Sequence, residues 1–257
     1  MKAVITGHHG YIGPYLYERL LRKENFRIDD ILLLDIKSGA DITVNTNIDR
    51  LFRFKPDIIF HLAALTSVDD SFNDPLETFR TNTFGTYNIL RFKASKIIFP
   101  SSATVYGNAI SAREDDSPHP QSPYAASKAA AEHIIRYSGN PYVILRLGNV
   151  YGRKPTRLIK ALKGGGKIFG EGIHTRDYVH VDDVVDAMIE AIDWPNNTYN
   201  IGTGVQTSVN EVANTMKVKK KYAPAKEEQE YISLNTRRAF QQGWAPKRNL
   251  CDFLESL

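Results

Sequence analysis

Short apolar runs alternate with helical patterns along the first 150 residues of the chain. The apolar runs are residues 3–6, 31–35, 58–62, 97–100 and 142–147. The helical patterns are residues 12–23, 48–54, 76–93 and 122–137. Continuous apolar runs are typical of strands that are buried on both faces of a sheet. The order therefore predicts an α/β fold with a doubly wound parallel sheet and right-handed crossovers.

The regular alternation loosens after about Tyr151. We expect helices at residues 157–163, 181–192 and 209–216, and strands at 177–180 and 199–201. We interpret residues 1–150 as the sheet region and residues 151–257 as mainly a small C-terminal cap, with a segment at about 177–202 that returns to the core. Such a cap would lie at the carboxyl edge of the sheet, where open α/β sheets bind ligands.

Composition excludes several other classes of protein. The 257 residues, 42% of them hydrophobic, suffice for one core. The 33 basic and 29 acidic residues form no basic stripe with interleaved aromatics, so we expect no nucleic-acid partner. Cys251 is the single cysteine, which excludes an internal disulfide. The N-terminal residues enter an apolar strand pattern without a secretory h-region or cleavage site, and no apolar run approaches the ~20 residues that span a bilayer, so we expect a cytoplasmic protein without a membrane partner.

Three glycines follow the first predicted strand and open the first predicted helix. Gly7, Gly10 and Gly13 have the spacing Gly-x-x-Gly-x-x-Gly. Glycines permit a tight turn and close backbone approach, and a helix N-terminus presents N–H groups to a pyrophosphate. Asp35 ends the second strand, where a carboxylate binds the adenosine ribose and repels the 2′-phosphate of NADP. The motif predicts NAD as the cofactor, and the nearby Lys37 weakens this preference only slightly.

A Tyr-x-x-x-Lys pair lies at the start of a predicted helix that opens with Pro123. Tyr124 and Lys128 are four residues apart and share a helical face. A nearby ammonium stabilises a phenolate and makes tyrosine a general base closer to neutral pH. Ser102 follows the strand that ends at Pro100 and is placed to hydrogen-bond a reacting oxygen. We predict that Ser102, Tyr124 and Lys128 are catalytic.

Together these features resemble the extended short-chain dehydrogenase/reductases, and among them the NAD-dependent epimerase/dehydratase family. The resemblance implies a Rossmann-type fold and is closest to the UDP-galactose 4-epimerases. Its motifs are Gly7-x-x-Gly10-x-x-Gly13, Asp35, Asp41-Ile42, His61-Leu62-Ala63-Ala64, Ser101-Ser102-Ala103-Thr104-Val105-Tyr106-Gly107, Tyr124-x-x-x-Lys128, Arg146-Leu147-Gly148-Asn149-Val150-Tyr151-Gly152 and Arg176-Asp177-Tyr178-Val179-His180-Val181-Asp182-Asp183.

The resemblance also implies which residues bind ligands. The NAD site would contain Gly7, Gly10, Tyr11, Ile12, Gly13, Asp35, Asp41, Ile42, Leu62, Ala63, Ala64, Thr66, Thr81, Tyr124 and Lys128. The nucleotide sugar would contact Ser102, Thr104, Tyr124, Asn149 and Arg176. Asn149 and Arg176 would hold the diphosphate, because a guanidinium matches phosphate oxygens in pairs. An ion pair with Asp177 or Asp183 is the alternative role of Arg176. The helices at 76–93 and 122–137 would pair between subunits of a homodimer.

The residues after Ser102 narrow the reaction that the resemblance implies. Dehydratases of the family carry Asp-Glu at the places held here by Ala103 and Thr104, so dehydration and decarboxylation are disfavoured. What remains is reversible oxidation at C4 of the hexose: Tyr124 removes the hydroxyl proton, hydride passes to NAD, and the ketose rotates before hydride returns. One alternative is a one-way nucleotide-sugar 4-reductase or dehydrogenase. Another is a non-catalytic cofactor-binding protein, which the retained Tyr124 and Lys128 disfavour.

Several positions depart from the family pattern. His8 and His9 replace smaller residues of the glycine loop, and we expect them to point outward or His8 to approach the cofactor phosphate. No histidine pair has metal-ligand spacing with a third partner, so we expect no metal. His180 is interpreted as a structural hydrogen-bonder. Residues 152–168 are fewer than in relatives, and residues 224–232 lack an arginine that relatives use for the diphosphate, with Lys226 as a candidate substitute.

Overall fold

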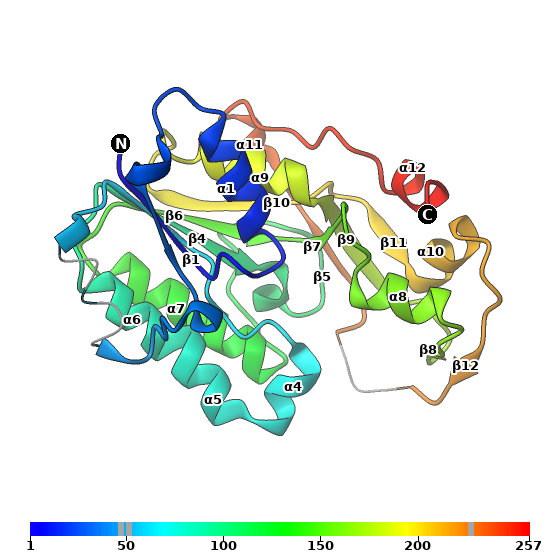
Figure 1. Ribbon diagram of the computed structural model, residues 1–257. Coiled ribbons are helices and arrows are strands. Elements are labelled where there is room, and N and C mark those ends of the chain that lie inside the picture. Colours follow the sequence, from blue (N-terminus) through cyan, green and yellow to red (C-terminus); the bar gives the residue numbers. More distant parts are fainter. Residues whose placement is uncertain (46–48, 50–52, 226–228) are drawn as a thin grey trace.

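We describe a computed structural model of the protein over residues 1–45, 49, 53–225 and 229–257 (Figure 1). Most of the helix predicted at 48–54, and Lys226, lie outside these described residues. No helix within them is long and apolar enough to cross a bilayer.

A six-stranded parallel sheet forms the centre of the molecule. Its strands, in spatial order, are β2 (Ile31–Leu34), β1 (Ala3–Thr6), β3 (Ile58–His61), β4 (Lys96–Ser102), β6 (Tyr142–Leu147) and β10 (Asn197–Ile201). The chain passes from β1 to β2 on one side and then to β3 on the other side of β1. The strand order therefore reverses at β1, and its carboxyl end is the place where such sheets bind ligands. The predicted doubly wound, Rossmann-type sheet is confirmed.

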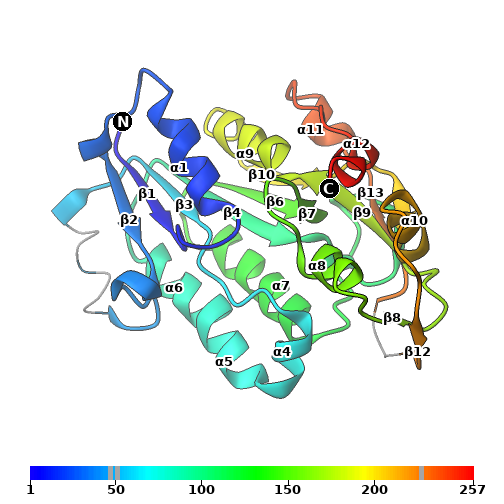
Figure 2. The ribbon, with the colours of Figure 1, turned by 45° about the vertical axis from the view of Figure 1, so that its right-hand side comes forward.

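Helices cover both faces of this sheet (Figures 1 and 2). One face carries α1 (Gly13–Leu21) and α9 (Val181–Glu190); the other carries α4 (Val68–Asn73), α5 (Pro75–Phe79), η3 (Arg80–Phe84), α6 (Gly85–Leu90) and α7 (Pro123–Arg136). Neighbouring residues of one strand enter different cores: Ile5 packs with α1 and α9, and Val4 packs with α6 and α7. This two-sided burial explains why the strands read as continuous apolar runs.

The helix predicted at 76–93 has an irregular centre. Residues Arg80–Phe84 form a five-residue π-helical segment, η3, between α5 and α6. A π turn inserts an extra residue and rotates the side chains that follow it, and such turns are frequent at functional sites. Here the segment buries the side chain of Asn82 against α7 and the loop after β3.

The second half of the chain builds a smaller unit at one end of the sheet (Figure 2). Its elements are β7 (Asn149–Tyr151), α8 (Arg157–Lys163), β8 (Ile168–Phe169), β9 (Thr175–His180), β11 (Gln206–Ser208), α10 (Val209–Thr215), β12 (Tyr222–Ala223) and α12 (Leu250–Glu255). Tyr151, Leu162 and Val212 belong to its separate apolar core. By contrast, α9 and β10 contribute Val184 and Ile201 to the main core.

The remaining elements are short and connect these units. They are η1 (Ile28–Asp30), η2 (Ile36–Ser38), η4 (Ala103–Tyr106), β5 (Ala109–Ala112), β13 (Ile232–Leu234) and α11 (Arg237–Phe240). The strands β5 and β13 pair in parallel although they are far apart in the sequence. This pairing ties the segment after Ser102 to the C-terminal part of the chain.

Candidate active site

The glycine turn after β1 is tightly packed against the neighbouring strand end. Gly7 has φ +70°, and a Cβ atom there would lie 2.6 Å from the backbone N of Ala63. A Cβ atom on Gly13 would lie 2.5 Å from Cα of His8, and the N–H of Gly10 donates to the carbonyl of Gly7 at 3.0 Å. Larger residues would therefore open the turn. The turn leads directly into α1 at the switch point, which fits a bound pyrophosphate.

Tyr11 joins this turn to the start of the cap. Its hydroxyl lies 2.5 Å from the carbonyl oxygen of Gly152 and 2.7 Å from that of Lys154. The next residue after Gly152, Arg153, pairs with Glu18 of α1 at 3.2 Å. The glycine turn and residues 152–154 are therefore held together from both sides.

Asp35 lies at the carboxyl end of β2, beside the glycine turn. Its carboxylate accepts hydrogen bonds from the backbone N–H groups of Lys37 and His9, both at 2.9 Å. Burial would raise the pKa of Asp35, but these two donors and the nearby histidines hold the pKa below its usual range. An ionised carboxylate here fits the hydroxyls of an adenosine ribose.

Asp41 and Ile42 follow on the same edge. The carboxylate of Asp41 accepts from the N–H of Thr43 at 2.7 Å. Ile42 is buried, and its side chain occupies the space that a Cβ atom on Gly85 of α6 would need. These two residues thus support the wall of the site beside Asp35.

The two histidines of the glycine loop lie against Asp35. The rings of His8 and His9 are 3.9 Å apart, and each of the three side chains offers a ligand atom within 4.8 Å of the others. The expectation that no histidine pair has a third partner is therefore wrong. The reason is tertiary: the turn brings residues 8 and 9 to a strand end 26 residues further along the chain.

A buried polar chain supports the loop after β3, where Leu62, Ala63, Ala64 and Thr66 lie. Thr6 Oγ1 accepts from the N–H of Ala63 at 3.1 Å and lies 2.8 Å from Nδ1 of His61. Nε2 of His61 lies 2.9 Å from Oγ1 of Thr86. Burial, with a contribution from Lys128, lowers the pKa of His61 to about 3, so the ring is neutral. The loop after β3 is thus held by a hydrogen-bonded chain of the uncharged side chains of Thr6, His61 and Thr86.

Asn82, which belongs to none of the sequence motifs, holds the same loop. It accepts from the N–H of Leu65 at 2.8 Å and donates to the carbonyl of Leu65 and to Oγ of Ser127, both at 2.9 Å. Thr81, which was selected, instead directs its hydroxyl to Glu77 at 3.2 Å. The sequence feature that could have indicated the role of Asn82 is its position as a polar residue in the middle of the apolar helical pattern at 76–93.

The Tyr-x-x-x-Lys pair occupies the first turns of α7. Oγ of Ser122 caps this helix by accepting from the N–H of Ala125 at 3.1 Å. Tyr124 and Lys128 are both buried, with 8% and 4% of their surfaces exposed. Burial raises the pKa of Tyr124, and a hydrogen bond with Ser102 opposes that rise. Ser102 and Tyr124 are therefore brought together, as the sequence predicted.

Lys128 is held differently from the expectation. Its Nζ donates to the carbonyl of Pro100 at 2.6 Å and lies 4.0 Å from the ring centroid of Phe99. Burial lowers its pKa to about 7, with Glu132 opposing. The ammonium is thus directed toward β4 through the Pro100 carbonyl, and the hydrogen bond that lowers the pKa of Tyr124 comes from Ser102. Lys128 thereby ties α7 to the strand that carries Ser102.

A buried ion pair lies one turn further along α7. Glu132 accepts from Nη2 of Arg146 at 2.7 Å and from Oγ of Ser101 at 2.5 Å, and all three side chains are almost fully buried. Arg136 also reaches Glu132, at 2.9 Å, but is partly exposed. The guanidinium of Arg146 stacks on Tyr106, 4.5 Å from the ring centroid. This cluster joins α7, β4 and β6 next to Ser102, Tyr124 and Lys128.

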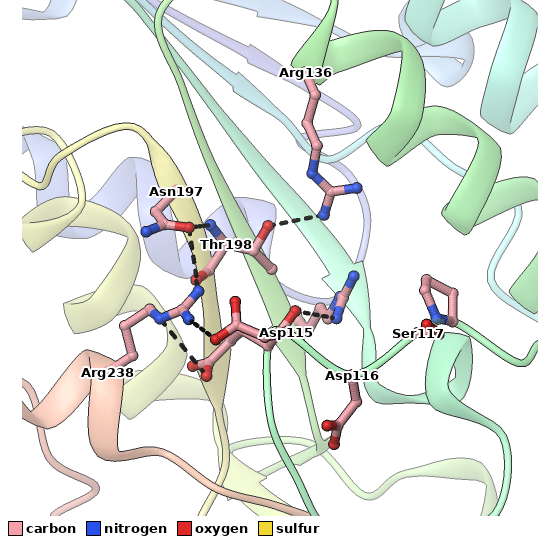
Figure 3. A pocket seen from close by; sticks show the side chains of 10 residues that line it. Asp115, Asp116, Ser117, Arg136, Asn197, Thr198 and Arg238 are labelled. Atoms are coloured by element: carbon pink, nitrogen blue, oxygen red, sulfur yellow. Dashed lines mark hydrogen bonds and ion pairs between the residues drawn. The ribbon is translucent and has the colours of Figure 1, made fainter.

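A cavity of about 300 Å³ opens on the solvent side of this cluster (Figure 3). Arg136 and Arg238 line it, together with carboxylates of the segment that follows β5. The guanidinium of Arg238 pairs with Asp115 at 2.7 Å, and that of Arg136 donates to Oγ1 of Thr198 at 2.9 Å. Because these cations are already paired, the cavity offers no unbalanced positive charge to an anion.

The predicted sugar-nucleotide residues lie around Ser102 and on the cap strands. Ser102 Oγ accepts from the N–H and Oγ1 of Thr104 at 3.2 and 2.9 Å. Asn149 is exposed at the start of β7. Arg176, on β9, donates to the carbonyls of Thr175 at 2.9 Å and Glu230 at 3.4 Å.

The carboxylates proposed as alternative partners of Arg176 are engaged elsewhere. Asp177 is fully buried and accepts from the N–H groups of Thr203 and Leu234 at 2.7 and 3.0 Å. Asp183 pairs with Arg248. His180 caps α9 by accepting from the N–H of Asp182 at 3.1 Å, in agreement with its predicted structural role.

The switch-point glycine turn, the carboxylate that ends β2 and the Ser–Tyr–Lys set define an enzyme of the extended short-chain dehydrogenase/reductase class. The chain belongs to the NAD dependent epimerase/dehydratase family, whose model matches residues 3–202. NAD is the cofactor of this family, and the geometry of the glycine turn and Asp35 fits it.

Several relatives make the comparison more specific. A putative UDP-glucose 4-epimerase of Methanocaldococcus jannaschii is 32% identical over 96% of this chain and 94% of the relative. The UDP-glucose 4-epimerase of Thermotoga maritima, solved with UDP-glucose, has a TM-score of 0.88 and 28% identity over 99% of this chain and 96% of that one. The UDP-glucose 4-epimerase of Thermus thermophilus, solved with NAD, has a TM-score of 0.84 and 27% identity over 99% and 97% of the two chains. Relatives named dTDP-D-glucose 4,6-dehydratase also match.

Proposed function

We propose that this protein is an NAD-dependent epimerase that inverts C4 of the hexose in a nucleotide sugar. Two classes of relative match the chain, 4-epimerases and 4,6-dehydratases. The residues after Ser102 favour the first class. Ala103 has a buried methyl group, and the hydroxyl of Thr104 is bonded to Ser102. Neither side chain is a general acid or base for water elimination. This absence of a carboxyl group beside Ser102 is the observation that carries the proposal.

The cofactor is held by the edge of the sheet that surrounds the glycine turn. The N–H groups at the start of α1 bind its pyrophosphate, and Asp35 binds the adenosine ribose. The loop after β3 is supported by Asn82 and His61. It forms the wall between the pyrophosphate and ribose sites on one side and Tyr124 on the other. When bound, NAD supplies the hydride acceptor and a positively charged ring.

Three side chains serve the proton chemistry: Tyr124 and Lys128, which are buried, and Ser102, which is partly buried. Tyr124 removes the proton of the C4 hydroxyl and later returns it. Ser102 hydrogen-bonds the same sugar oxygen and, by its contact with Tyr124, opposes the rise that burial causes in the pKa of the phenol. Lys128 binds the Pro100 carbonyl, which keeps Tyr124 and Ser102 at a fixed separation. Rotation of the 4-keto sugar between the two hydride transfers, and not a second base, produces inversion.

The substrate is bound between the sheet and the cap. We assign the sheet region, residues 1–150, to the cofactor and most of residues 151–257 to the nucleotide sugar. Thr104 lies on the sugar side of Ser102, and Asn149 and Arg176 bind the diphosphate. Asn149 and Arg176 lie on strands β7 and β9, which are hydrogen-bonded neighbours.

A panel of nucleotide sugars tests the proposal. The purified protein is incubated with UDP-, GDP-, dTDP- and CDP-hexoses, and the products are separated by chromatography. We expect interconversion of two C4 epimers without net formation of NADH. A 4-keto-6-deoxy product would overturn the proposal in favour of a dehydratase. Stoichiometric production of NADH would overturn it in favour of a one-way dehydrogenase that uses the same three residues.

We also propose that the enzyme is a cytoplasmic homodimer. The free and exposed thiol of Cys251 suits a reducing compartment. Large apolar side chains are exposed together on α4, α5, η3 and α6, namely Phe72, Leu76, Phe79, Phe84 and Tyr87. An exposed apolar face of this kind favours association with a second copy through these helices and α7.

A further inference from the structure

The side chains of His8, His9 and Asp35 form a cluster that the epimerase reaction does not use as a whole. Two imidazoles and one carboxylate are a common ligand set for zinc and related dications. One ligand atom of each residue lies within 4.8 Å of the others. In a tetrahedral site with bonds of about 2.0–2.1 Å, ligand atoms are roughly 3.3 Å apart. Small side-chain rotations are therefore enough to close the cluster around an ion.

Two features of the cluster point to a ligand. Nδ1 of His8 is shielded from solvent and makes no hydrogen bond of normal geometry with the described residues, although the ring also interacts with the backbone of Leu34. A polar atom in that condition is unfavourable unless something binds it. The second feature is the fixed carboxylate: Asp35 is held by the N–H groups of His9 and Lys37 and retains further lone pairs. One of these donors belongs to a proposed ligand, so the backbone itself orients the cluster.

The glycine turn makes this arrangement rigid. Gly7 adopts a left-handed conformation, and the N–H of Gly7 donates to the carbonyl of Leu34 at 2.7 Å. Leu34 directly precedes Asp35. The turn that carries the histidines and the strand end that carries the carboxylate are thus joined by a backbone hydrogen bond, which keeps the three Cα positions close together while the side chains remain free to rotate toward an ion.

We propose that His8, His9 and Asp35 bind a transition-metal dication such as Zn²⁺ or Ni²⁺ in the cofactor-free protein. The site coincides with the place that the proposed function gives to the adenosine ribose. The metal and NAD therefore exclude one another, and that second part of the inference rests on the proposed function. Metal would block loading of the cofactor, and bound NAD would protect the protein from the metal.

Calorimetric titration of the cofactor-free protein with ZnCl₂ and NiCl₂ tests the site. The Cys251→Ser background removes the exposed thiol as a competing soft ligand. We expect one ion per chain at micromolar affinity, and at least tenfold weaker binding in His8→Ala and in His9→Ala. His133→Ala, which removes an exposed histidine of α7, is the matched control and should bind like the parent. Equal binding in all four proteins, or no binding in the parent, would overturn the proposal.

A competition experiment separates this inference from the proposed function. The parent is saturated with NAD and titrated with ZnCl₂ again, and we expect the heat of binding to disappear. If metal binding depends on both histidines but persists in the presence of NAD, the metal site stands and the placement of the ribose at Asp35 is overturned. A protein that lacks epimerase activity would leave the titration of the histidine variants unaffected.

Discussion

Nζ of Lys128 donates a 2.6 Å hydrogen bond to the carbonyl oxygen of Pro100, a residue of β4 that lies two positions before Ser102. The ammonium is buried, and the face of Phe99 is its other neighbour. One carbonyl and one aromatic ring stabilise the charged ammonium less than water does. Burial therefore lowers the pKa of Lys128 from 10.5 to about 7. The lysine therefore costs stability in the cofactor-free protein.

The destabilisation caused by the buried Lys128 ammonium should decrease as the pH rises. Between pH 7 and 10.5 the unfolded chain holds the Lys128 proton and the folded chain does not, so the free energy of unfolding rises with pH by roughly 1 kcal/mol per unit. Below pH 7 both states are protonated and the full cost remains. Lys128→Met removes this contribution. We expect the variant to exceed the wild type in stability at pH 7 and to approach it near pH 10.5, as measured by urea unfolding without NAD.

The control for this prediction is Lys160→Met, which changes an exposed lysine of α8. It should leave the difference in unfolding free energy between the two pH values unchanged. A Lys128→Met protein with the same pH slope as the wild type would show that the ammonium is well solvated in the folded state.

Tyr124→Phe should abolish turnover without releasing the cofactor. The variant removes the proton acceptor and leaves the packing of the buried ring almost unchanged. We expect kcat to fall by at least about 10²–10⁴-fold, the usual contribution of a general base. NAD content of the purified variant, measured after denaturation, should match that of the wild type. Tyr137→Phe, at an exposed position after α7, is the control and should retain full activity. Substantial turnover by Tyr124→Phe would remove this residue as the base.

Two arginines that share one carboxylate provide a comparison of buried and exposed ion pairs. Arg146→Met removes the buried partner of Glu132 and should cost about 3–5 kcal/mol of unfolding free energy, because the carboxylate stays buried. Arg136→Met removes the partly exposed partner and should cost less than about 1 kcal/mol. Equal losses in urea unfolding would contradict this assignment. The double variant Glu132→Leu, Arg146→Met should recover much of the stability, since no fully buried charge is then left without a partner and Arg136 is partly exposed to water.

The apolar face on α4–α6 predicts how the subunits associate. Leu76 is 80% exposed at the start of this face, and Leu76→Glu would bury a charge in the proposed dimer. We expect the wild type to sediment as a dimer at micromolar concentration and the variant as a monomer. Ile28→Glu changes an equally apolar exposed residue far from these helices and should leave the dimer intact. A monomeric wild type would contradict the proposed dimer interface on α4–α6.

Much of the fold could be predicted because its strands are buried on both faces. The runs at 3–6 and 142–147 coincide with β1 and β6. The short strands β5 and β13 were not predicted, since three or four residues with mixed polarity carry no periodic signal and their pairing joins distant parts of the chain. Thr81 was placed near the cofactor site by the family resemblance alone, and the contacts of Asn82 with the loop after β3 could not be predicted because the π turn in η3 is not visible in the sequence.

In the site, too, features set by neighbouring residues in the sequence could be predicted, and features set by contacts between distant segments could not. The positions of Tyr124 and Ser102 follow from a helix start and a strand end, and both are visible in the sequence. The direction of the Lys128 ammonium is not, because it depends on the Pro100 carbonyl of a neighbouring strand. The contact of His9 with Asp35 likewise arises only when β1 and β2 pair.

The bond from the Tyr11 hydroxyl to the carbonyl of Gly152 joins residues 141 positions apart. On a ribosome the glycine turn emerges early, and its acceptors at residues 152 and 154 follow only after more than half of the polypeptide has been made. The glycine turn of the nascent chain therefore lacks the hydrogen bonds between Tyr11 and residues 152–154 until translation is well advanced. Complete fastening of the glycine turn therefore requires a chain that has been made at least as far as Lys154.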